Sequence, residues 1–265
     1  MSAVGRWMSQ ALLRAPASVR SLRGIPVLGR LIHGFSHRLI HPDEKVWARI
    51  ESGPAKGLWI ELNPRTGQSY ARGETEIVVQ KFIASRIKPG DVFYDLGANI
   101  GLFTLIAARS TGLNGKVFSF EPDPANATRL RRNVAKNGFD KVSIQEVGIW
   151  SSTTELTFAV SPLSSPDRGV GTFMNVAPAE QQLAVHCVSL DDFATHMPPP
   201  TGVKCDVEGA EFEVVKGART TISRHRPWLL FEMHSPESNR DVVAFLAELG
   251  YSFKQIDETH VFASP

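Results

Sequence analysis

The segment from 95 to 101 reads Asp-Leu-Gly-Ala-Asn-Ile-Gly and joins two stretches of different character. The residues before it, Val92, Phe93 and Tyr94, are apolar and typical of a short buried strand. The residues after it, 102–108, carry apolar side chains at helical spacing. The glycines therefore lie in the turn between a strand and a helix, where a missing side chain lets a ligand approach the backbone and the helix N-terminus.

A carboxylate stands where the partner of such a turn is expected. Glu121 ends the apolar stretch 117–120 and lies 20 residues after Gly101. In an α/β unit, a carboxylate that ends the second strand can accept hydrogen bonds from the ribose hydroxyls of an adenosine group. The two signals together predict a nucleoside-cofactor site, and a tight turn that binds nothing is the simpler alternative.

Two cofactors compete for a nucleoside site of this kind. NAD needs room for a pyrophosphate, which three glycines spaced G-x-G-x-x-G usually provide. Here the spacing from Gly97 to Gly101 is G-x-x-x-G, and Asp95 precedes it. A carboxylate would repel a pyrophosphate, but it suits the cationic amino-acid end of S-adenosylmethionine. The sequence therefore favours S-adenosylmethionine over NAD, with these candidate contacts: Asp95, Gly97, Ala98, Asn99, Gly101 and Glu121.

The charge of the chain is unevenly distributed. The 265 residues carry a formal net charge of +2, and residues 1–40 hold six arginines and no lysine, aspartate or glutamate. The rest of the chain is therefore mildly acidic, which argues against a nucleic-acid groove spread over the folded domain. Cys187 and Cys205 are the only cysteines and lack metal-ligand spacing, so we expect small core residues of a reducing compartment.

The basic N-terminal extension, residues 1–45, differs in composition from the domain that follows. Its apolar side chains lie among arginines, and Pro16 and Pro26 break any long helix. Three interpretations stay open: a loosely packed helical extension, a segment on an anionic membrane surface, or a transit peptide. No stretch reaches the ~18 consecutive apolar residues of a membrane-spanning helix. We expect a cytoplasmic protein that can contact a membrane surface through residues 1–40.

Predicted strands and helices alternate over the domain, residues 46–265. Residues 46–62 are predicted to form a β-hairpin around Ser52-Gly53-Pro54. Further strands are predicted at 92–94, 117–120, 142–145, 203–207, 228–233, 251–256 and 260–263. Helices are predicted at 74–87, 102–108, 124–137, 208–222 and 241–249. The less regular residues 150–200 are expected to form a substrate-facing insertion with hairpin character.

This alternation predicts the fold class. We expect an α/β fold with a Rossmann-like, doubly wound, mostly parallel seven-stranded sheet, preceded by an N-terminal helical and β-hairpin extension. Ligands of such sheets lie at the carboxyl ends of the strands. The candidate cofactor residues all follow predicted strands, so they belong to that edge.

Polar residues follow two further predicted strands at the same edge. Lys204, Asp206 and Glu208 share one parity of the first, and Glu232 and His234 share one parity of the second. Acids beside a histidine at strand ends are typical of an active site, although a structural histidine or a buried ion pair gives the same pattern. Lys204 is expected to pair with Asp206 and keep it ionised.

Three motifs together resemble the FkbM-type S-adenosylmethionine-dependent methyltransferases. They are Asp-Leu-Gly-Ala-Asn-Ile-Gly-x-Phe-Thr at 95–104, Phe-Glu-Pro-Asp-Pro at 120–124 and Val-Lys-Cys-Asp-Val-Glu-Gly-Ala-Glu at 203–211. Val-Val-Lys-Gly-Ala at 214–218 and Phe-Glu-Met-His at 231–234 extend the similarity, which covers roughly residues 50–235. The resemblance implies a class I methyltransferase fold and O-methylation of a hydroxyl, commonly on a sugar, a glycan or a polyketide-derived metabolite.

The resemblance also implies roles for single residues. The methionine end of the cofactor would contact Asp95, Gly97, Asn99 and Gly101, and its ribose would contact Glu121. Asp206 and Glu208 would border the methyl-transfer site, with Asp206 also touching the cofactor. A family element, Gly-x-aromatic-Glu, corresponds to Gly73-Glu74-Thr75-Glu76, in which Thr75 stands in the aromatic place. The resemblance makes Glu76 a candidate for an acid beside the cofactor.

Methyl transfer to a hydroxyl needs few protein groups. A sulfonium methyl is already electrophilic, so the protein must align an oxygen behind it and remove the proton of that oxygen. We predict that His234 is this base and that Asp206 orients it or the acceptor hydroxyl, with Glu208 at the same site. No metal is predicted, although Asp206, Glu208, Glu232 and His234 are ligands suited to Mg²⁺ or Mn²⁺.

Two other functions stay open. An N-methyltransferase acting on a nucleobase or another small molecule usually carries an aromatic residue after the fourth strand, but Asp206-Val207-Glu208-Gly209 offers none. A non-catalytic module that binds S-adenosylmethionine would have no need for an intact Asp206 and His234. The expected partner is therefore a hydroxyl-bearing small molecule or glycan and not a nucleic acid.

Overall fold

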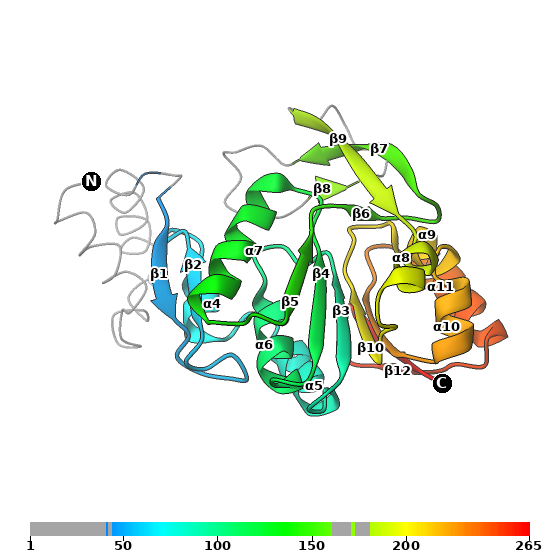
Figure 1. Ribbon diagram of the computed structural model, residues 1–265, viewed down its shortest axis with the longest axis horizontal. Coiled ribbons are helices and arrows are strands. Elements are labelled where there is room, and N and C mark those ends of the chain that lie inside the picture. Colours follow the sequence, from blue (N-terminus) through cyan, green and yellow to red (C-terminus); the bar gives the residue numbers. More distant parts are fainter. Residues whose placement is uncertain (1–40, 42–43, 161–170, 173–180) are drawn as a thin grey trace. The chain divides into compact units, whose positions relative to one another are not determined.

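The computed structural model describes residue 41 and residues 44–160, 171–172 and 181–265 (Figure 1). The predicted basic extension lies outside the described residues up to residue 40, as do residues 161–170 and 173–180 of the predicted insertion. The chain divides into two compact units, and the division between them falls after Ile77. The described helices include none long and apolar enough to cross a membrane.

The N-terminal unit contains the predicted β-hairpin. Strand β1 (Val46–Arg49) pairs antiparallel with β2 (Trp59–Leu62), and a short helix, α4 (Gln68–Arg72), follows. The helix predicted at 74–87 begins only at Ile77, as α5 (Ile77–Arg86). Gly73 and Glu76 both have positive φ, 77° and 45°, and such residues cannot continue a right-handed helix. The backbone before Ile77 therefore ends one helix and delays the next.

The second unit is built on the predicted seven-stranded sheet. Its strand order is β12-β13-β11-β10-β3-β4-β5. The bounds are β3 Val92–Leu96, β4 Lys116–Phe120, β5 Val142–Gln145, β10 Gly202–Cys205, β11 Trp228–Glu232, β12 Ser252–Gln255 and β13 His260–Ser264. The five strands from β11 to β5 are parallel, and β13 runs antiparallel to both of its neighbours. The predicted Rossmann-like α/β fold is confirmed.

Helices join the strands of this sheet. They are α6 Leu102–Thr111, α7 Pro124–Lys136, α8 Leu190–His196, α9 Glu211–Lys216, α10 Arg219–His225 and α11 Pro236–Glu248. The side chain of Asp123 accepts a hydrogen bond from the backbone N–H of Ala125 and begins α7, as its sequence predicts. The side chain of Ser235 likewise accepts a hydrogen bond from a backbone N–H at the start of α11, and the first helical residue, Pro236, lies five residues before the start expected at Asp241.

The single helix predicted at 208–222 is wrong. Glu208 and Gly209 have positive φ, 54° and 97°, so the first helical residue is Glu211. A second break at Gly217 separates α9 from α10, and only glycine fits here because a Cβ would overlap the backbone carbonyl oxygen of Trp150. The residues between β10 and α9 therefore form a loop, which leaves Glu208 outside the helix.

A second, four-stranded sheet forms the described part of the insertion. Its strands are β6 Gly148–Ile149, β7 Thr154–Val160, β8 Gly171–Thr172 and β9 Gln181–Val188, in the order β6-β9-β7-β8. Strand β7 pairs antiparallel with β9 over its full length, so the hairpin character expected here is confirmed. Because β6 begins three residues after β5 ends, this sheet lies beyond the carboxyl ends of the central strands (Figure 1).

Apolar side chains fill the space beneath these carboxyl ends. The ring of Phe193 from α8 contacts the rings of Tyr94, Phe118 and Phe120 at centroid distances of 5.6, 5.4 and 4.9 Å. Edge-to-face contacts of this kind stabilise packing and fix ring orientation. Cys187 and Cys205 are both buried and free, as expected. The loops at this edge therefore lie above a cluster of packed aromatic rings.

Candidate active site

The loop after β3 has an unusual backbone. Gly97, Asn99 and Gly101 have φ values of 73°, 50° and 95°, in the left-handed region that glycine and asparagine tolerate best. The N–H groups of Gly97 and Ala98 both donate to the carbonyl oxygen of Phe120, at 3.0 and 2.9 Å. The loop is therefore anchored to the end of β4 and turns sharply into α6.

Packing explains two of these glycines. A Cβ on Gly97 would overlap the backbone carbonyl oxygen of Asp206, and a Cβ on Gly101 would overlap the side chain of Leu130. Gly97 thus allows the loop after β10 to approach the loop after β3. Gly101 allows α6 to approach α7. The glycines attributed to cofactor approach are therefore also required by the fold.

Glu121 lies where the sequence places it, at the end of β4. Only 5% of the residue is exposed. Its Oε2 accepts the N–H of Asn99 at 2.7 Å and its Oε1 accepts the N–H of Asp123 at 2.9 Å. Burial raises the pKa of Glu121 to about 8, and the two backbone hydrogen bonds oppose this shift. The Asn126 side chain also donates to Glu121, and further donors from a bound ribose would favour the ionised form, whose two oxygens offer about four acceptor positions.

Glu121 and the glycine loop line a pocket. The predicted site residues in its wall are Gly97, Asn99, Glu121, Asp206 and Glu208. Apolar walls come from residues that the sequence analysis did not single out: Phe120, Val147, Ile149, Phe158 and Val207. The mixture of apolar walls with a few polar groups is typical of small-molecule sites.

The pocket fits an adenosine-containing cofactor. Glu121 offers a fixed carboxylate for ribose hydroxyls, and the apolar walls offer a surface for a purine. Neither Asp95 nor Ala98 nor Gly101 is part of the pocket wall. Their predicted contacts with the cofactor stay predictions.

Asp95 is completely buried in this structure. One of its oxygens accepts a hydrogen bond from Thr104 Oγ1 at 2.6 Å, and Thr104 Oγ1 also lies 2.9 Å from Ser119 Oγ. The other oxygen has no hydrogen-bond partner within the described ranges. Burial raises the pKa of Asp95, against the opposing charge of Lys204 and the hydrogen bond from Thr104. The Asp95 carboxylate therefore contacts buried protein groups and does not line the pocket.

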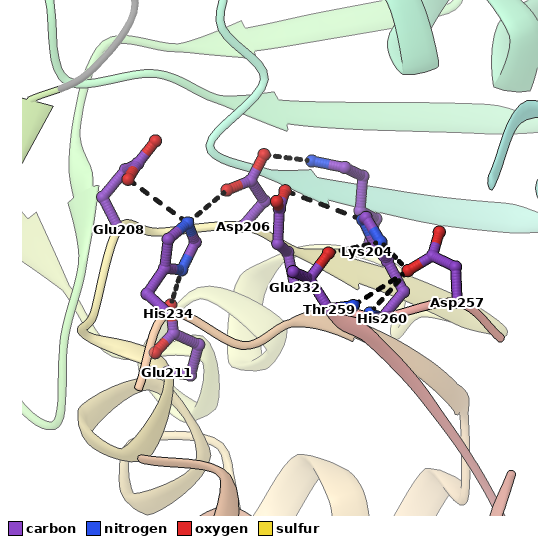
Figure 2. A network of polar contacts seen from close by, with 9 residues as sticks. All are labelled: Lys204, Asp206, Glu208, Glu211, Glu232, His234, Asp257, Thr259 and His260. Carbon is purple, nitrogen blue, oxygen red and sulfur yellow. Dashed lines mark hydrogen bonds and ion pairs between the residues drawn. The ribbon is translucent and has the colours of Figure 1, made fainter. Parts of the chain in front are cut away.

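Four side chains form a carboxylate–histidine cluster: Asp206, Glu208, Glu211 and His234 (Figure 2). His234 Nε2 lies 3.2 Å from Glu208 Oε2 and 3.7 Å from Asp206 Oδ1, and His234 Nδ1 lies 2.8 Å from Glu211 Oε1. The side chain of His234 is 24% exposed. The predicted catalytic residues are thus brought together around one imidazole ring.

The predicted ion pair beneath the cluster is confirmed. Lys204 Nζ lies 3.0 Å from Asp206 Oδ2, and the lysine side chain is only 2% exposed. The same ammonium group lies 4.9 Å from the centre of the Phe103 ring. Lys204 therefore fixes one oxygen of Asp206 and leaves the other, Oδ1, directed toward His234.

The sequence analysis missed Glu211, which is fully buried. Its Oε1 accepts a hydrogen bond from the N–H of Gly209 at 2.9 Å and also contacts His234 Nδ1. Its Oε2 accepts a hydrogen bond from Ser238 Oγ at 2.7 Å. Burial opposes its ionisation, but hydrogen bonds from His234, Ser238 and Gly209 lower the pKa of Glu211 below its usual value. Glu211 is the last residue of the family-like motif at 203–211, and this position could have indicated a role at the site.

The charges of the cluster change the basicity of its members. The hydrogen bond to Glu211, together with the charges of Glu208, Glu211 and Asp206, raises the pKa of His234 to about 9 although burial opposes this. Burial raises the pKa of Glu208 as well, and the charge of His234 opposes that shift. The imidazole ring is therefore mostly protonated at neutral pH in this structure.

A second set of donor atoms adjoins the cluster. One oxygen each of Asp206 and Glu232 and a ring nitrogen of His234 all lie within 4.8 Å of one another. Glu232 Oε2 also lies 3.6 Å from Nε2 of the buried His260, whose Nδ1 contacts Asp257 Oδ1 at 2.8 Å (Figure 2). Three such atoms have the chemistry of a divalent-cation site, but His234 and Asp206 already have charged protein partners.

Glu76, the remaining predicted cofactor contact, belongs to the N-terminal unit. It is partly buried and lies one residue before α5, with φ of 45°. Its role beside the cofactor stays a prediction.

Known proteins resemble a large part of this chain. The Methyltransferase FkbM domain matches residues 95–253. The hexuronic acid methyltransferase AglP of Haloferax volcanii is 30% identical over 179 residues, which cover 67% of this chain and 69% of AglP. The 2-O-methyltransferase NoeI of Sinorhizobium fredii is 27% identical over 193 residues, which cover 64% of this chain and 76% of NoeI.

A solved structure agrees at the level of the fold. The crystal structure of the methyltransferase FkbM from Methylobacillus flagellatus has a TM-score of 0.50 and 22% sequence identity to this chain. The alignment covers 67% of this chain and 44% of that one. The domain match and the similarity to AglP show the family, and this chain belongs to the FkbM family of S-adenosylmethionine-dependent methyltransferases.

Proposed function

We propose that this protein transfers the methyl group of S-adenosylmethionine to a hydroxyl of a sugar, a glycan or a related metabolite. One observation carries the proposal: Asp206 and Glu208 belong both to the pocket that contains Glu121 and to the carboxylate–histidine cluster. A cofactor site and a proton-accepting group are thus parts of one site. The names of two relatives, a hexuronic acid methyltransferase and a 2-O-methyltransferase, support an oxygen acceptor.

The protein residues then have separate tasks. The cofactor supplies an electrophilic methyl group: the acceptor oxygen bonds to the methyl carbon as the carbon–sulfur bond breaks toward sulfur, which leaves S-adenosylhomocysteine, while the hydroxyl proton goes to the protein. Glu121 accepts hydrogen bonds from the ribose hydroxyls. Asp206, held by Lys204, accepts a hydrogen bond at the border of the acceptor site.

His234 is the proton acceptor in this proposal. A sugar hydroxyl is a very weak acid, so a strong base accepts its proton more effectively than a weak one. The carboxylates around His234 raise its pKa to about 9, which makes the neutral ring a stronger base than an ordinary histidine. Only the neutral ring can act, so this base strength is offset by a smaller active fraction at neutral pH.

The charges of the acceptor site favour an uncharged acceptor. Asp206, Glu208 and Glu232 are partly exposed carboxylates, with side-chain exposures of 22%, 29% and 25%. The positive charges in contact with Asp206 and Glu208 are those of His234 and the buried Lys204. A hexuronate carboxylate entering this site would meet like charges, which cost binding energy. A neutral sugar hydroxyl meets hydrogen-bond acceptors instead.

A product assay tests the proposal. The full chain is incubated with S-adenosylmethionine and a panel of neutral sugars, hexuronates and lipid-linked sugars, and mass spectrometry records the methylated product and S-adenosylhomocysteine. We expect both products with a neutral acceptor, formed at least about 100-fold more slowly by His234→Ala. Methylation of an amine alone would favour the N-methyltransferase alternative. Cofactor binding with no product from any acceptor would favour the non-catalytic binding module.

The basic N-terminal extension favours an acceptor that is located at a membrane surface. A lipid-linked acceptor is compatible with a protein that contacts an anionic surface through residues 1–40. Flotation with liposomes that contain an anionic lipid would test this contact. Equal binding by the full chain and by a variant without residues 1–40 would contradict it.

A further inference from the structure

Glu211 has the properties of a residue that acts through another. It is completely buried, so it cannot reach an acceptor molecule. Three donors converge on it: His234 Nδ1 and the N–H of Gly209 on Oε1, and Ser238 Oγ on Oε2. A buried carboxylate with this many donors is ionised and fixed in place. Its only partner in the carboxylate–histidine cluster is His234.

The backbone around Glu211 supports the same conclusion. Glu208 and Gly209 adopt positive φ, so the chain turns back before α9 begins. Through this turn Glu208 reaches Nε2 of His234, whereas Glu211 reaches Nδ1 on the other side of the ring. Ser238 on α11 holds the second oxygen of Glu211. The carboxylate therefore belongs to a framework made by two helices and the loop between β10 and α9.

We propose that Glu211 is a positioning residue that fixes the ring of His234 and keeps its proton on Nδ1, so that Nε2 faces the acceptor hydroxyl. The ring nitrogens of a histidine are distinguished by the hydrogen bond that each makes. With Nδ1–H donated to Glu211, the neutral ring has its free lone pair on Nε2. This inference rests on the proposed function in taking His234 as the proton acceptor.

Charged groups from three elements face the His234 ring. Asp206 and Glu208 come from the loop after β10, Glu211 comes from α9, and Glu232 lies at the end of β11. Lys204 offsets one of these charges through Asp206. Since Glu211 makes the shortest contact with the ring, its removal is expected to change the basicity of His234 more than removal of an outer carboxylate.

The test replaces Glu211 by glutamine and observes His234 directly. In the full chain labelled with ¹⁵N-histidine, NMR gives the pKa and the tautomer of His234 without any acceptor. We expect Glu211→Gln to lower this pKa by about 1–3 units and to shift the acid limb of the activity profile by the same amount. Turnover should fall by about 10²- to 10⁴-fold because the ring loses its orientation, while the Kd for S-adenosylhomocysteine should stay within about 3-fold.

Glu213→Gln is the matched control. It makes the same chemical change two residues along α9, at a partly exposed side chain that pairs with Lys216. This variant should keep the His234 pKa and turnover of the parent protein. If Glu211→Gln does not fold, Glu211→Asp withdraws the carboxylate by one methylene, and the pKa and turnover should fall in the same direction.

Two results would overturn the inference. One is an unchanged pKa and tautomer of His234 in a folded Glu211 variant. The other is lower turnover with an unshifted pH profile, which would indicate a merely structural role. The NMR arm needs no acceptor, so a failure of the proposed function, with no methylated product in any assay, is distinguishable from a failure of this inference.

Discussion

Replacing Glu121 by glutamine should weaken cofactor binding and leave the rest of the site intact. The two carboxylate oxygens hold the N–H groups of Asn99 and Asp123, at 2.7 and 2.9 Å, so their positions are fixed before any ligand binds. Glutamine keeps one acceptor oxygen and turns the other position into a donor. That donor would face either a backbone N–H or a ribose hydroxyl that needs an acceptor.

The size of the effect follows from these contacts. A hydrogen bond to a charged group contributes about 1.5–3 kcal/mol, and the substitution removes one such bond to the ribose. Since about 1.4 kcal/mol corresponds to a tenfold change in affinity, the Kd for S-adenosylhomocysteine should rise by about 10- to 150-fold. Isothermal titration calorimetry measures this directly. Glu146→Gln, at a surface residue paired with Arg131, is the matched control and should change Kd by less than about 3-fold.

Thermal unfolding separates binding from folding in this experiment. Glu121→Gln also disturbs two backbone hydrogen bonds, so a lower Tm is expected in the absence of ligand. A Kd within about 3-fold of the parent value in a folded variant would refute the assignment of the ribose to Glu121. An equal loss of affinity in Glu146→Gln would refute the specificity of the effect.

Four further predictions concern the acceptor side and the loops. His234→Ala should lower turnover by about 10²- to 10⁴-fold with unchanged Kd for S-adenosylhomocysteine, and near-normal turnover would exclude it as the base. The raised pKa of His234, about 9, should give an activity that increases with pH above neutrality. Its stabilising effect on folding should be complete below about pH 6.5 and lost as pH rises through about 9, so Tm should fall more steeply over this range in the parent than in His234→Ala. Gly97→Ala should cost more than about 2 kcal/mol in unfolding free energy because a Cβ would overlap the Asp206 carbonyl, whereas Gly138→Ala, at a similar φ with no neighbour within 4 Å, should cost about 1 kcal/mol. Turnover should persist in EDTA, since His234 and Asp206 already have charged protein partners, and a loss restored by Mg²⁺ would show a metal role.

Local signals predict much of the fold. Short, mostly apolar stretches indicate β3, β4 and β5, and the Asp123-Pro124 pair indicates the start of α7. Parity along β10 also predicts that Lys204 and Asp206 share a face, and they pair at 3.0 Å. These features depend on neighbours in the sequence or on the common edge of a parallel sheet, so they can be derived without coordinates.

The helix after β10 shows where local reasoning fails. Acidic residues at 208 and 211 suit the first turn of a helix, which favours a helix start at Glu208. A continuous helix would place Glu208 and Glu211 three residues apart on one face. Instead, positive φ at Glu208 and Gly209 separates them, and they contact opposite nitrogens of one ring. The sequence alone does not specify a left-handed glutamate, so the role of Glu211 emerges only with the backbone.

The cofactor loop and the acceptor loop are joined through main-chain contacts as well as by side chains. The N–H of Asp206 donates to the carbonyl oxygen of Leu96 at 3.0 Å, and the carbonyl oxygen of Asp206 lies where a Cβ on Gly97 would be. A shift of the loop after β3 must therefore move Asp206, and Asp206 contacts His234 and the pocket that contains Glu121. The glycine at 97 thus has a function beyond the predicted contact with a cofactor, because it allows the loop that carries Asp206 to lie against the loop after β3. This explains why a four-residue glycine spacing and a strand-end aspartate, more than 100 residues apart, belong to one site.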